Sequence, residues 1–318
     1  MSLDRRLVRA GRLIDAVAPA QAKVKAPDLV VPNPVEFATD ERYLGQPLAP
    51  RPGTLLKVIF LRDDLFTEFD LRVIEEWQAG FTLPDPDDQT IVDDVVRYHG
   101  TEGAPPDLLE RIRRCKADGR RWFGEVVFVG GRRGGKGHVG AIAGLYVTWH
   151  LLVSGDPQAA FGIAPTKQLQ GVVFAGNRQQ AQSNQFADLS SMAREAPCFR
   201  PFLDRSTTSG SAVGLMTPAQ LAQGDERDAL LMLVAKATTA LGGRGPATFM
   251  AYFDEFAHSQ GAGSTSDSEE LWQAVTPSLA QCGMDGFVYQ GSSPWAQDGQ
   301  FFVNYRRGSR STLSPPSR

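Results

Sequence analysis

The sequence predicts an α/β fold in which helices flank a mostly parallel β-sheet. From Trp122 onward, short apolar runs alternate with longer segments whose apolar residues follow the helical period. The runs lack polar alternation, which is typical of strands buried on both faces; they are EVVFV at 125–129, GVVFA at 171–175, LLMLVA at 230–235, FMAYF at 249–253 and GFVYQ at 286–290. Alternating strands and helices predict a parallel sheet that binds ligands at the carboxyl ends of its strands.

Helices are expected between and before these strands. Their apolar spacing places them at 66–81, around 90–98, at 106–117, at 141–153, at 178–196 and at 268–282. The run LLKVIFL at 55–61 fits a further strand. We therefore expect a mostly helical N-terminal subregion at 55–121 and an α/β core at 122–305.

Both ends of the chain are expected to lie outside the packed core. Residues 1–54 read as an extended arm, because proline is dense in stretches such as VPNPVEF and LAPRPGT. A short amphipathic pattern at 1–17 precedes these prolines and lacks the apolar core of a signal peptide. The tail at 306–318, RRGSRSTLSPPSR, has the composition of a disordered segment.

Composition excludes several classes of protein. The formal net charge is -3, with 33 basic and 36 acidic residues, so any DNA contact requires a local basic patch. Cys115, Cys198 and Cys282 form no CxxC pair, which argues against a zinc site or a disulfide framework and favours a cytoplasmic setting. No apolar stretch reaches the roughly 18 residues that a membrane helix needs.

A glycine-rich loop follows the first strand of the core and precedes a helix. Its spacing is GxxxxGK, which allows backbone N–H groups to surround phosphate oxygens while the lysine reaches the outer phosphates. The expected phosphate-binding residues are Gly130, Gly131, Arg132, Arg133, Gly134, Gly135, Lys136, Gly137 and His138. Gly137 occupies the position where a Ser or Thr normally holds magnesium, so we expect water, carboxylates and the nucleotide to hold that ion.

Two further strand ends carry polar residues. The run FMAYF ends in Asp254 and Glu255, where an aspartate can hold the shell of a magnesium ion and a glutamate can polarise an attacking water. We interpret His258, close behind them, as structural. The last strand ends in Ser292, Ser293 and Pro294, and small hydroxyl residues at this place can sense a γ-phosphate by hydrogen bonding in one state only.

The three motifs together resemble those of the large terminase subunits of tailed double-stranded DNA bacteriophages. The loop matches the GRRxGK form of the family's Walker A motif, and the last motif matches its Ser/Thr-rich coupling triplet ending in proline. VVFAGNRQQAQSNQFADL resembles the second strand and helix of the family's ATPase core, and ATTALGGRGPATFMAYFDEFAH its Arg-Gly element before Walker B. The resemblance covers residues 122–305 and implies an ASCE-type P-loop NTPase core that uses ATP and Mg²⁺.

The resemblance also implies roles for individual residues. Lys136 would bind the β- and γ-phosphates, Asp254 would serve magnesium and Glu255 would be the catalytic carboxylate. Ser292, Ser293 and Pro294 would couple hydrolysis to movement. The arginine that stabilises the transferred phosphoryl group would be Arg132, Arg133 or Arg244. By the same resemblance, Gln78 would be the counterpart of an upstream glutamine that recognises adenine in some relatives.

The implied function is an ATP-driven motor that moves double-stranded DNA into a procapsid. Its partners would be DNA, the portal protein, the small terminase subunit and further copies of itself in a ring, at the portal vertex in the host cytoplasm. The family's C-terminal nuclease domain has no room before Arg318, so we expect ATPase activity without DNA cleavage. Two alternatives stay open: a helicase-like translocase, and a nucleotide-binding assembly module that hydrolyses weakly.

Overall fold

A computed structural model describes most of the chain, and it has an α/β fold. The described residues are 29–79, 107–130, 134–175, 185–224, 228–237, 247–258, 266–293 and 299–310. A seven-stranded sheet has the order β1-β7-β6-β2-β5-β4-β3. The strands are β1 Glu125–Val129, β2 Leu169–Ala175, β3 Leu203–Ser209, β4 Ala212–Leu215, β5 Leu231–Ala237, β6 Ala247–Asp254 and β7 Phe287–Ser292.

The sheet is mostly parallel, as the sequence predicts. Strands β1, β7, β6, β2 and β5 pair in parallel, and each of them coincides with one of the five predicted apolar runs. Strands β3 and β4 form an antiparallel hairpin against β5 that the sequence analysis did not predict. The reason is that β3, with sequence LDRSTTS, is polar and at most half-buried, so it carries no apolar run.

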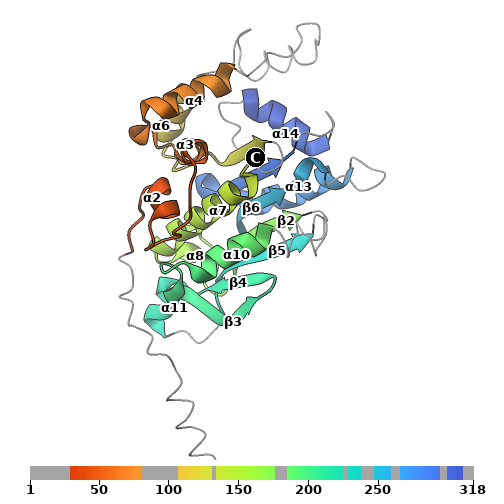
Figure 1. Cartoon of the computed structure of the whole chain (residues 1–318). Helices are drawn as coiled ribbons and strands as arrows, with labels where there is room; N and C mark the ends of the chain where they lie inside the picture. Colours follow the sequence, from red (N-terminus) through yellow and green to blue (C-terminus); the bar gives the residue numbers. More distant parts are fainter. Residues whose placement is uncertain are drawn as a thin grey trace, which may run out of the picture.

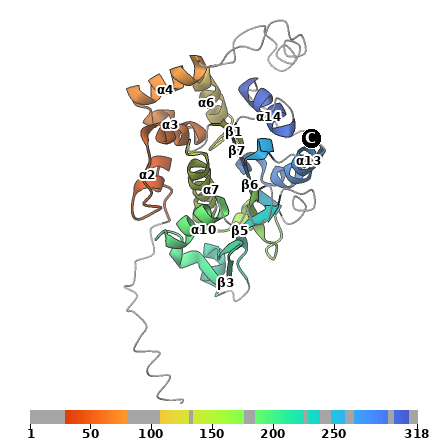
Figure 2. The same cartoon turned by 45° about the vertical axis from the view of Figure 1, so that its right-hand side comes forward.

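Helices cover both faces of the sheet (Figures 1 and 2). Helices α7 and α10 pack on one face, and α13 and α14 pack on the other. The helices and 3-10 turns are α2 Pro34–Thr39, α3 Pro50–Ile59, η1 Asp63–Leu65, α4 Glu68–Ala79, α6 Leu108–Ala117, α7 Lys136–Val153, α8 Pro157–Ala160, α10 Gln185–Glu195, η2 Arg200–Phe202, α11 Pro218–Gln223, η3 Phe256–His258, α13 Ser266–Ala280, η4 Gly283–Asp285 and α14 Gly299–Arg310.

Most predicted helices within the described residues are confirmed. Helices α4, α6, α7 and α13 match the segments expected at 66–81, 106–117, 141–153 and 268–282, and α10 matches the described part of 178–196. The segments expected around 1–17 and 90–98 lie outside the described residues. The strand expected at 55–61 is not found, because LLKVIFL belongs mainly to helix α3. The disordered tail expected at 306–318 is wrong for its first residues, since α14 continues through Arg310, and residues 311–318 lie outside the described residues.

The N-terminal arm is packed where the structure describes it, so the expectation of an extended arm is wrong for residues 29–54. Asn33 caps α2, and prolines occupy the first turns of α2 and α3, where a missing N–H costs nothing. Phe37 is fully buried in the main hydrophobic cluster. Tyr146 and Trp149 of α7 donate hydrogen bonds to backbone carbonyls in this segment at 2.6 and 2.9 Å.

Helix α7 approaches the sheet closely because glycines face it. A Cβ atom at Gly140 would lie 2.7 Å from Cε1 of Tyr289 on β7 and 2.8 Å from Cζ of Tyr252 on β6. At Gly144 it would lie 2.7 Å from Sδ of Met250. The hydroxyl of Tyr289 also donates to the carbonyl of Lys136 at 2.8 Å, so the first turn of α7 is fixed against β7.

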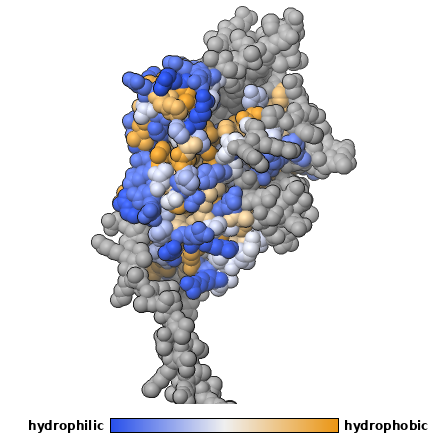
Figure 3. All heavy atoms as spheres, viewed as in Figure 1, coloured by the Kyte–Doolittle hydropathy of each residue, from blue (hydrophilic) through white to orange (hydrophobic). Residues whose placement is uncertain are grey.

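The surface in Figure 3 mixes hydrophilic residues with smaller hydrophobic areas. Among the described helices, none combines the length and the apolar character that crossing a membrane requires.

Candidate active site

Three sequence motifs meet at one edge of the sheet. Strand β7 lies between β1 and β6, and all three strands are parallel, so their carboxyl ends share an edge. The register pairs Val129 with Ser292 and Gly291 with Asp254. The N–H of Gly130 donates to the carbonyl of Ser292 at 3.1 Å. The start of the glycine-rich loop, the acidic pair and the serine pair are therefore neighbours.

Lys136 reaches back from the first turn of α7 into this edge. Its ammonium donates to the carbonyl of Gly130 at 3.0 Å and to Oγ of Ser293 at 3.3 Å. The same Nζ lies 3.5 Å from Oε1 of Glu255, which makes an ion pair. The lysine is only 7% exposed, so its charge is weakly screened by water and acts strongly on its neighbours.

Glu255 is held in one orientation by the end of β7. Its Oε2 accepts hydrogen bonds from the N–H of Ser293 at 2.8 Å and from the hydroxyl of Ser292 at 3.2 Å, and its Oε1 accepts from the Ser293 hydroxyl at 3.2 Å. Its own N–H donates to the carbonyl of Gly291 at 2.8 Å. The backbone of Glu255 has φ +48°, a strained conformation for a residue with a side chain, and these bonds keep it there.

The two neighbouring carboxyl groups differ in acidity. Burial raises the pKa of Asp254 to about 7, the charge of Glu255 adds to this shift, and Lys136 only partly opposes it. Asp188 of α10 adds a smaller contribution in the same direction. Partial burial works to raise the pKa of Glu255 as well, but the Ser293 N–H and the charge of Lys136 outweigh it, so that pKa is lowered. Glu255 is therefore anionic at neutral pH while Asp254 is near its midpoint.

The donor atoms suit a magnesium ion that is shared with a phosphate ligand. Asp254 and Glu255 supply two carboxylates, and the hydroxyl groups of Ser292 and Ser293 hold the carboxylate of Glu255. Within the described residues, no group of three or more His, Cys, Asp and Glu side chains is placed to hold a metal ion. Mg²⁺ typically takes one or two carboxylates and completes its shell with waters and substrate phosphates, so this set fits it.

The described part of the glycine-rich loop leads directly into α7. Gly134 precedes Gly135, and Gly135 caps the helix with φ +75°, a left-handed conformation that favours glycine. Gly137 lies in the first helical turn. The ring of His138 points to the N-terminal segment, with Nε2 3.1 Å from the carbonyl of Pro47. His138 therefore ties the loop helix to the segment between α2 and α3.

The remaining predicted residues are not part of this cluster as described. Gln78 lies on α4, where its amide donates to Asp107 at 3.3 Å, and no contact described for it involves Lys136, Glu255 or the serine pair. Several predicted residues lie outside the described residues: Gly131, Arg132, Arg133, Arg244 and Pro294.

Two residues near the site were not assigned to it from the sequence. His258, interpreted as structural, has Nε2 3.6 Å from Oε2 of Glu255. Asp188 belongs to the helix of the Gln-Ala segment and acts electrostatically on Asp254. The contact of His258 has a sequence signal, because the histidine stands three residues after Glu255. The effect of Asp188 on Asp254 comes from packing between separate elements and has no local signal.

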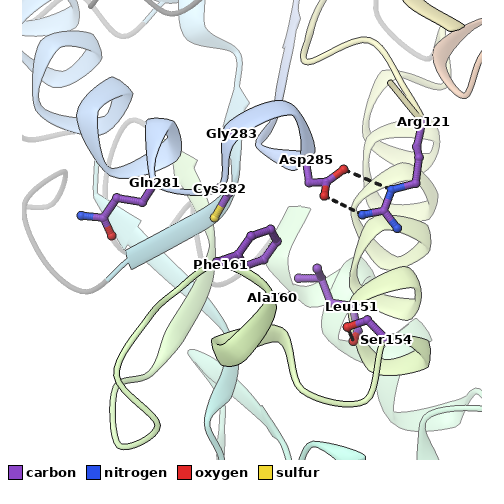
Figure 4. Close-up of a pocket in the computed structure, with 9 residues that line it drawn as sticks. All are labelled: Arg121, Leu151, Ser154, Ala160, Phe161, Gln281, Cys282, Gly283 and Asp285. Atoms are coloured by element: carbon purple, nitrogen blue, oxygen red, sulfur yellow. Dashed lines mark hydrogen bonds and ion pairs between the residues drawn. The ribbon is translucent and has the colours of Figure 1, made fainter. Parts of the chain in front are cut away.

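A pocket elsewhere on the molecule is distinct from this cluster (Figure 4). It includes Asp285 and Gly283, which precede β7, and Ser154, which follows α7, so it lies toward the opposite edge of the sheet. Arg121 and Asp285 form an ion pair of 2.7 Å in its wall. This pocket is not lined by Lys136, Asp254, Glu255, Ser292 or Ser293.

No protein-family model matches this chain. A comparison with curated proteins also gives no match. The function is therefore inferred from the geometry around Lys136 and Glu255 together with the sequence motifs.

Proposed function

We propose that the chain binds ATP with Mg²⁺ at this edge of the sheet and hydrolyses it, as the motor domain of a phage large terminase. One observation carries the proposal. Lys136, Glu255 and the Ser292–Ser293 pair come from three separate elements, yet they form one hydrogen-bonded cluster at the carboxyl ends of adjacent parallel strands. Clusters of this kind at a strand-to-helix loop are suited to phosphoryl chemistry.

Phosphate binding would use a lysine that is now bonded to other groups of the protein. Lys136 is paired with Glu255 and with the Gly130 carbonyl, and a triphosphate offers its ammonium stronger anionic partners. The amino end of α7 points its positive pole toward the same place. Binding of the nucleotide would thus draw Lys136 away from Glu255.

Hydrolysis would depend on the two carboxyl groups in different ways. Glu255, held by the serines, is placed to orient and polarise an attacking water. Asp254 would hold Mg²⁺ through its shell, and a cation beside it would favour its anionic form. When bound, the ion would neutralise charge on the phosphates.

The DNA-packaging role is supported by the sequence resemblance. Double-stranded DNA, the portal protein, the small terminase subunit and a ring of identical subunits are the partners it implies. The arginine that assists hydrolysis would be Arg132, Arg133 or Arg244.

Turnover of ATP by the purified chain tests the enzymatic core of the proposal. With Mg²⁺ present we expect phosphate release that falls by roughly 10²-fold or more in Glu255→Gln, while nucleotide affinity changes little, because the amide keeps the shape but cannot accept a proton. Absence of hydrolysis in the unaltered chain, even with portal and DNA added, would sink it. Strand displacement on a forked duplex would instead favour a helicase-like translocase.

Gly137 favours a second candidate, a nucleotide-binding assembly module with weak hydrolysis. No hydroxyl is available at this position to hold magnesium. If Glu255→Gln leaves turnover unchanged while ATP still binds, this candidate replaces the motor. A rise in Mg²⁺-dependent turnover in Gly137→Ser would show that the missing hydroxyl limits the rate.

A further inference from the structure

A chain of side-chain hydrogen bonds, buried at its centre, ties α14 to the sheet beside the candidate site. Gln300 donates to Oδ1 of Asn304 at 2.7 Å, Asn304 donates to Oε1 of Gln290 at 3.0 Å, and Gln290 donates to Oε1 of Glu125 at 2.9 Å. Gln290 and Asn304 are both fully buried. The chain thus crosses from α14 through β7 to β1.

Helix α14 also packs against the turn that carries the acidic pair. Phe301 of α14 belongs to the same hydrophobic cluster as Phe256 and Ala257 of η3, which directly follow Glu255. The N–H of Ala257 donates to Oγ of Ser292 at 3.2 Å. One helix therefore contacts both the turn after Glu255 and the strand that ends in Ser292.

The position of Gln290 links this chain to the serine pair. Gln290 and Ser292 are two residues apart on β7, so their side chains lie on the same face of the strand. Tyr289 and Gly291 alternate with them and face α7. A shift at the end of β7 would consequently displace Gln290, which contacts α14 through Asn304.

The hydrogen bond between Asn304 and Gln290 fixes the register of α14 on β7 more strictly than apolar packing would. A buried amide pair adds little net stability compared with an apolar pair of the same shape, but it is satisfied in one register only. Apolar side chains tolerate sliding, whereas a slip of α14 would break the bond between Nδ2 of Asn304 and Oε1 of Gln290. The chain is thus suited to transmitting small displacements.

We propose that Gln290 and Asn304 are positioning residues that transmit the state of the Glu255–Ser293 contact to α14. The proposal rests on nucleotide binding at the site, as proposed above. When phosphate draws Lys136 away, the hydrogen bonds between Glu255 and Ser293 rearrange, the end of β7 adjusts, and α14 follows through its fixed register with Gln290. The position of helix α14 would then depend on whether phosphate is bound at the site.

Amide hydrogen exchange across residues 299–310 tests this inference on the full chain, with and without a non-hydrolysable ATP analogue and Mg²⁺. In the unaltered protein we expect the analogue to change exchange in α14 on the order of tenfold. In Gln290→Met/Asn304→Leu, which replaces the amide pair by apolar side chains of similar size, the response should vanish while the Kd for the analogue stays within about threefold. Val303→Ala, on the exposed side of α14, is the matched control and should keep the response.

The single variant Asn304→Leu guards against a misfolded double variant, since it keeps the bond between Gln290 and Glu125. The same loss of response is expected there. A full response in either variant would overturn the role of the amide pair. Binding of the analogue without any change in α14 of the unaltered protein would overturn the inference and leave the proposed function standing. Failure to bind the analogue at all would overturn both.

Discussion

The backbone N–H of Ser293 donates a 2.8 Å hydrogen bond to Oε2 of Glu255, and so joins the ends of two neighbouring strands, β7 and β6. This bond contributes to the lowered pKa of Glu255 and stabilises its left-handed backbone. Lys136 completes the arrangement from the third element. In this state the carboxylate of Glu255 already forms an ion pair with Lys136, the residue that a phosphate would bind. Phosphate binding is therefore expected to break the ion pair between Lys136 and Glu255.

Replacement of Lys136 by alanine should weaken ATP binding by roughly 10- to 100-fold, because a charge-assisted contact to phosphate is lost. Titration of a fluorescent ATP analogue gives the Kd. Lys167→Ala, an exposed lysine outside the cluster, is the control and should bind normally. Equal affinity in Lys136→Ala and the unaltered chain would contradict the assignment of the phosphate site.

Ser293→Ala should lower turnover about tenfold and leave the Kd for ATP nearly unchanged. The variant keeps the N–H that holds Oε2 but loses the hydroxyl that contacts both Oε1 and the Lys136 ammonium, so Glu255 gains freedom. Steady-state kinetics alongside a binding titration separates the two quantities. Ser293→Thr retains a hydroxyl and should recover most of the rate; if it is as slow as the alanine variant, the hydroxyl is not the cause.

Asp254→Asn should stabilise the metal-free protein at alkaline pH. Because burial raises the pKa of Asp254 to about 7, the folded state prefers its protonated form, and stability is lost as pH rises from the ordinary carboxyl pKa through 7. The amide carries no charge and escapes this loss. Urea unfolding with a chelator present should show a gain of about 2–4 kcal/mol at pH 8 and little at pH 4.

Magnesium provides the control for this prediction. A cation bound at the site would stabilise the ionised form of Asp254, so the two proteins should differ less in their free energy of unfolding at pH 8. A gain of equal size at both pH values would mean that ionisation of Asp254 is not its source.

Gly140→Ala should destabilise the fold by about 1–3 kcal/mol, because the new methyl group meets the rings of Tyr289 and Tyr252 at 2.7 and 2.8 Å. Gly144→Ala is the matched comparison on the same helix. Its methyl group meets mainly the flexible tip of Met250, so repacking and the better helix propensity of alanine should hold the change within about 1 kcal/mol. Thermal or urea unfolding measures both, and the reverse order would contradict the packing of α7.

Local patterns were sufficient for the parallel part of the sheet. Each of the five apolar runs became a strand because burial on both faces requires an uninterrupted apolar run, which is visible in sequence. The hairpin β3–β4 was missed because its first strand is polar and half-exposed. The N-terminal prolines predict an extended arm, yet they begin helices α2 and α3, which pack against α7. This packing involves a distant part of the chain and has no local sequence signal.

Local sequence patterns identify the residues at the strand ends: Gly130 and Lys136 after one strand, Asp254 and Glu255 at another, Ser292 and Ser293 at a third. That these residues meet depends on strand order and register, which arise from hydrogen bonds between distant segments and which no local pattern encodes. The opposite pKa shifts of Asp254 and Glu255 have the same origin. They depend on burial and on neighbours supplied by other elements.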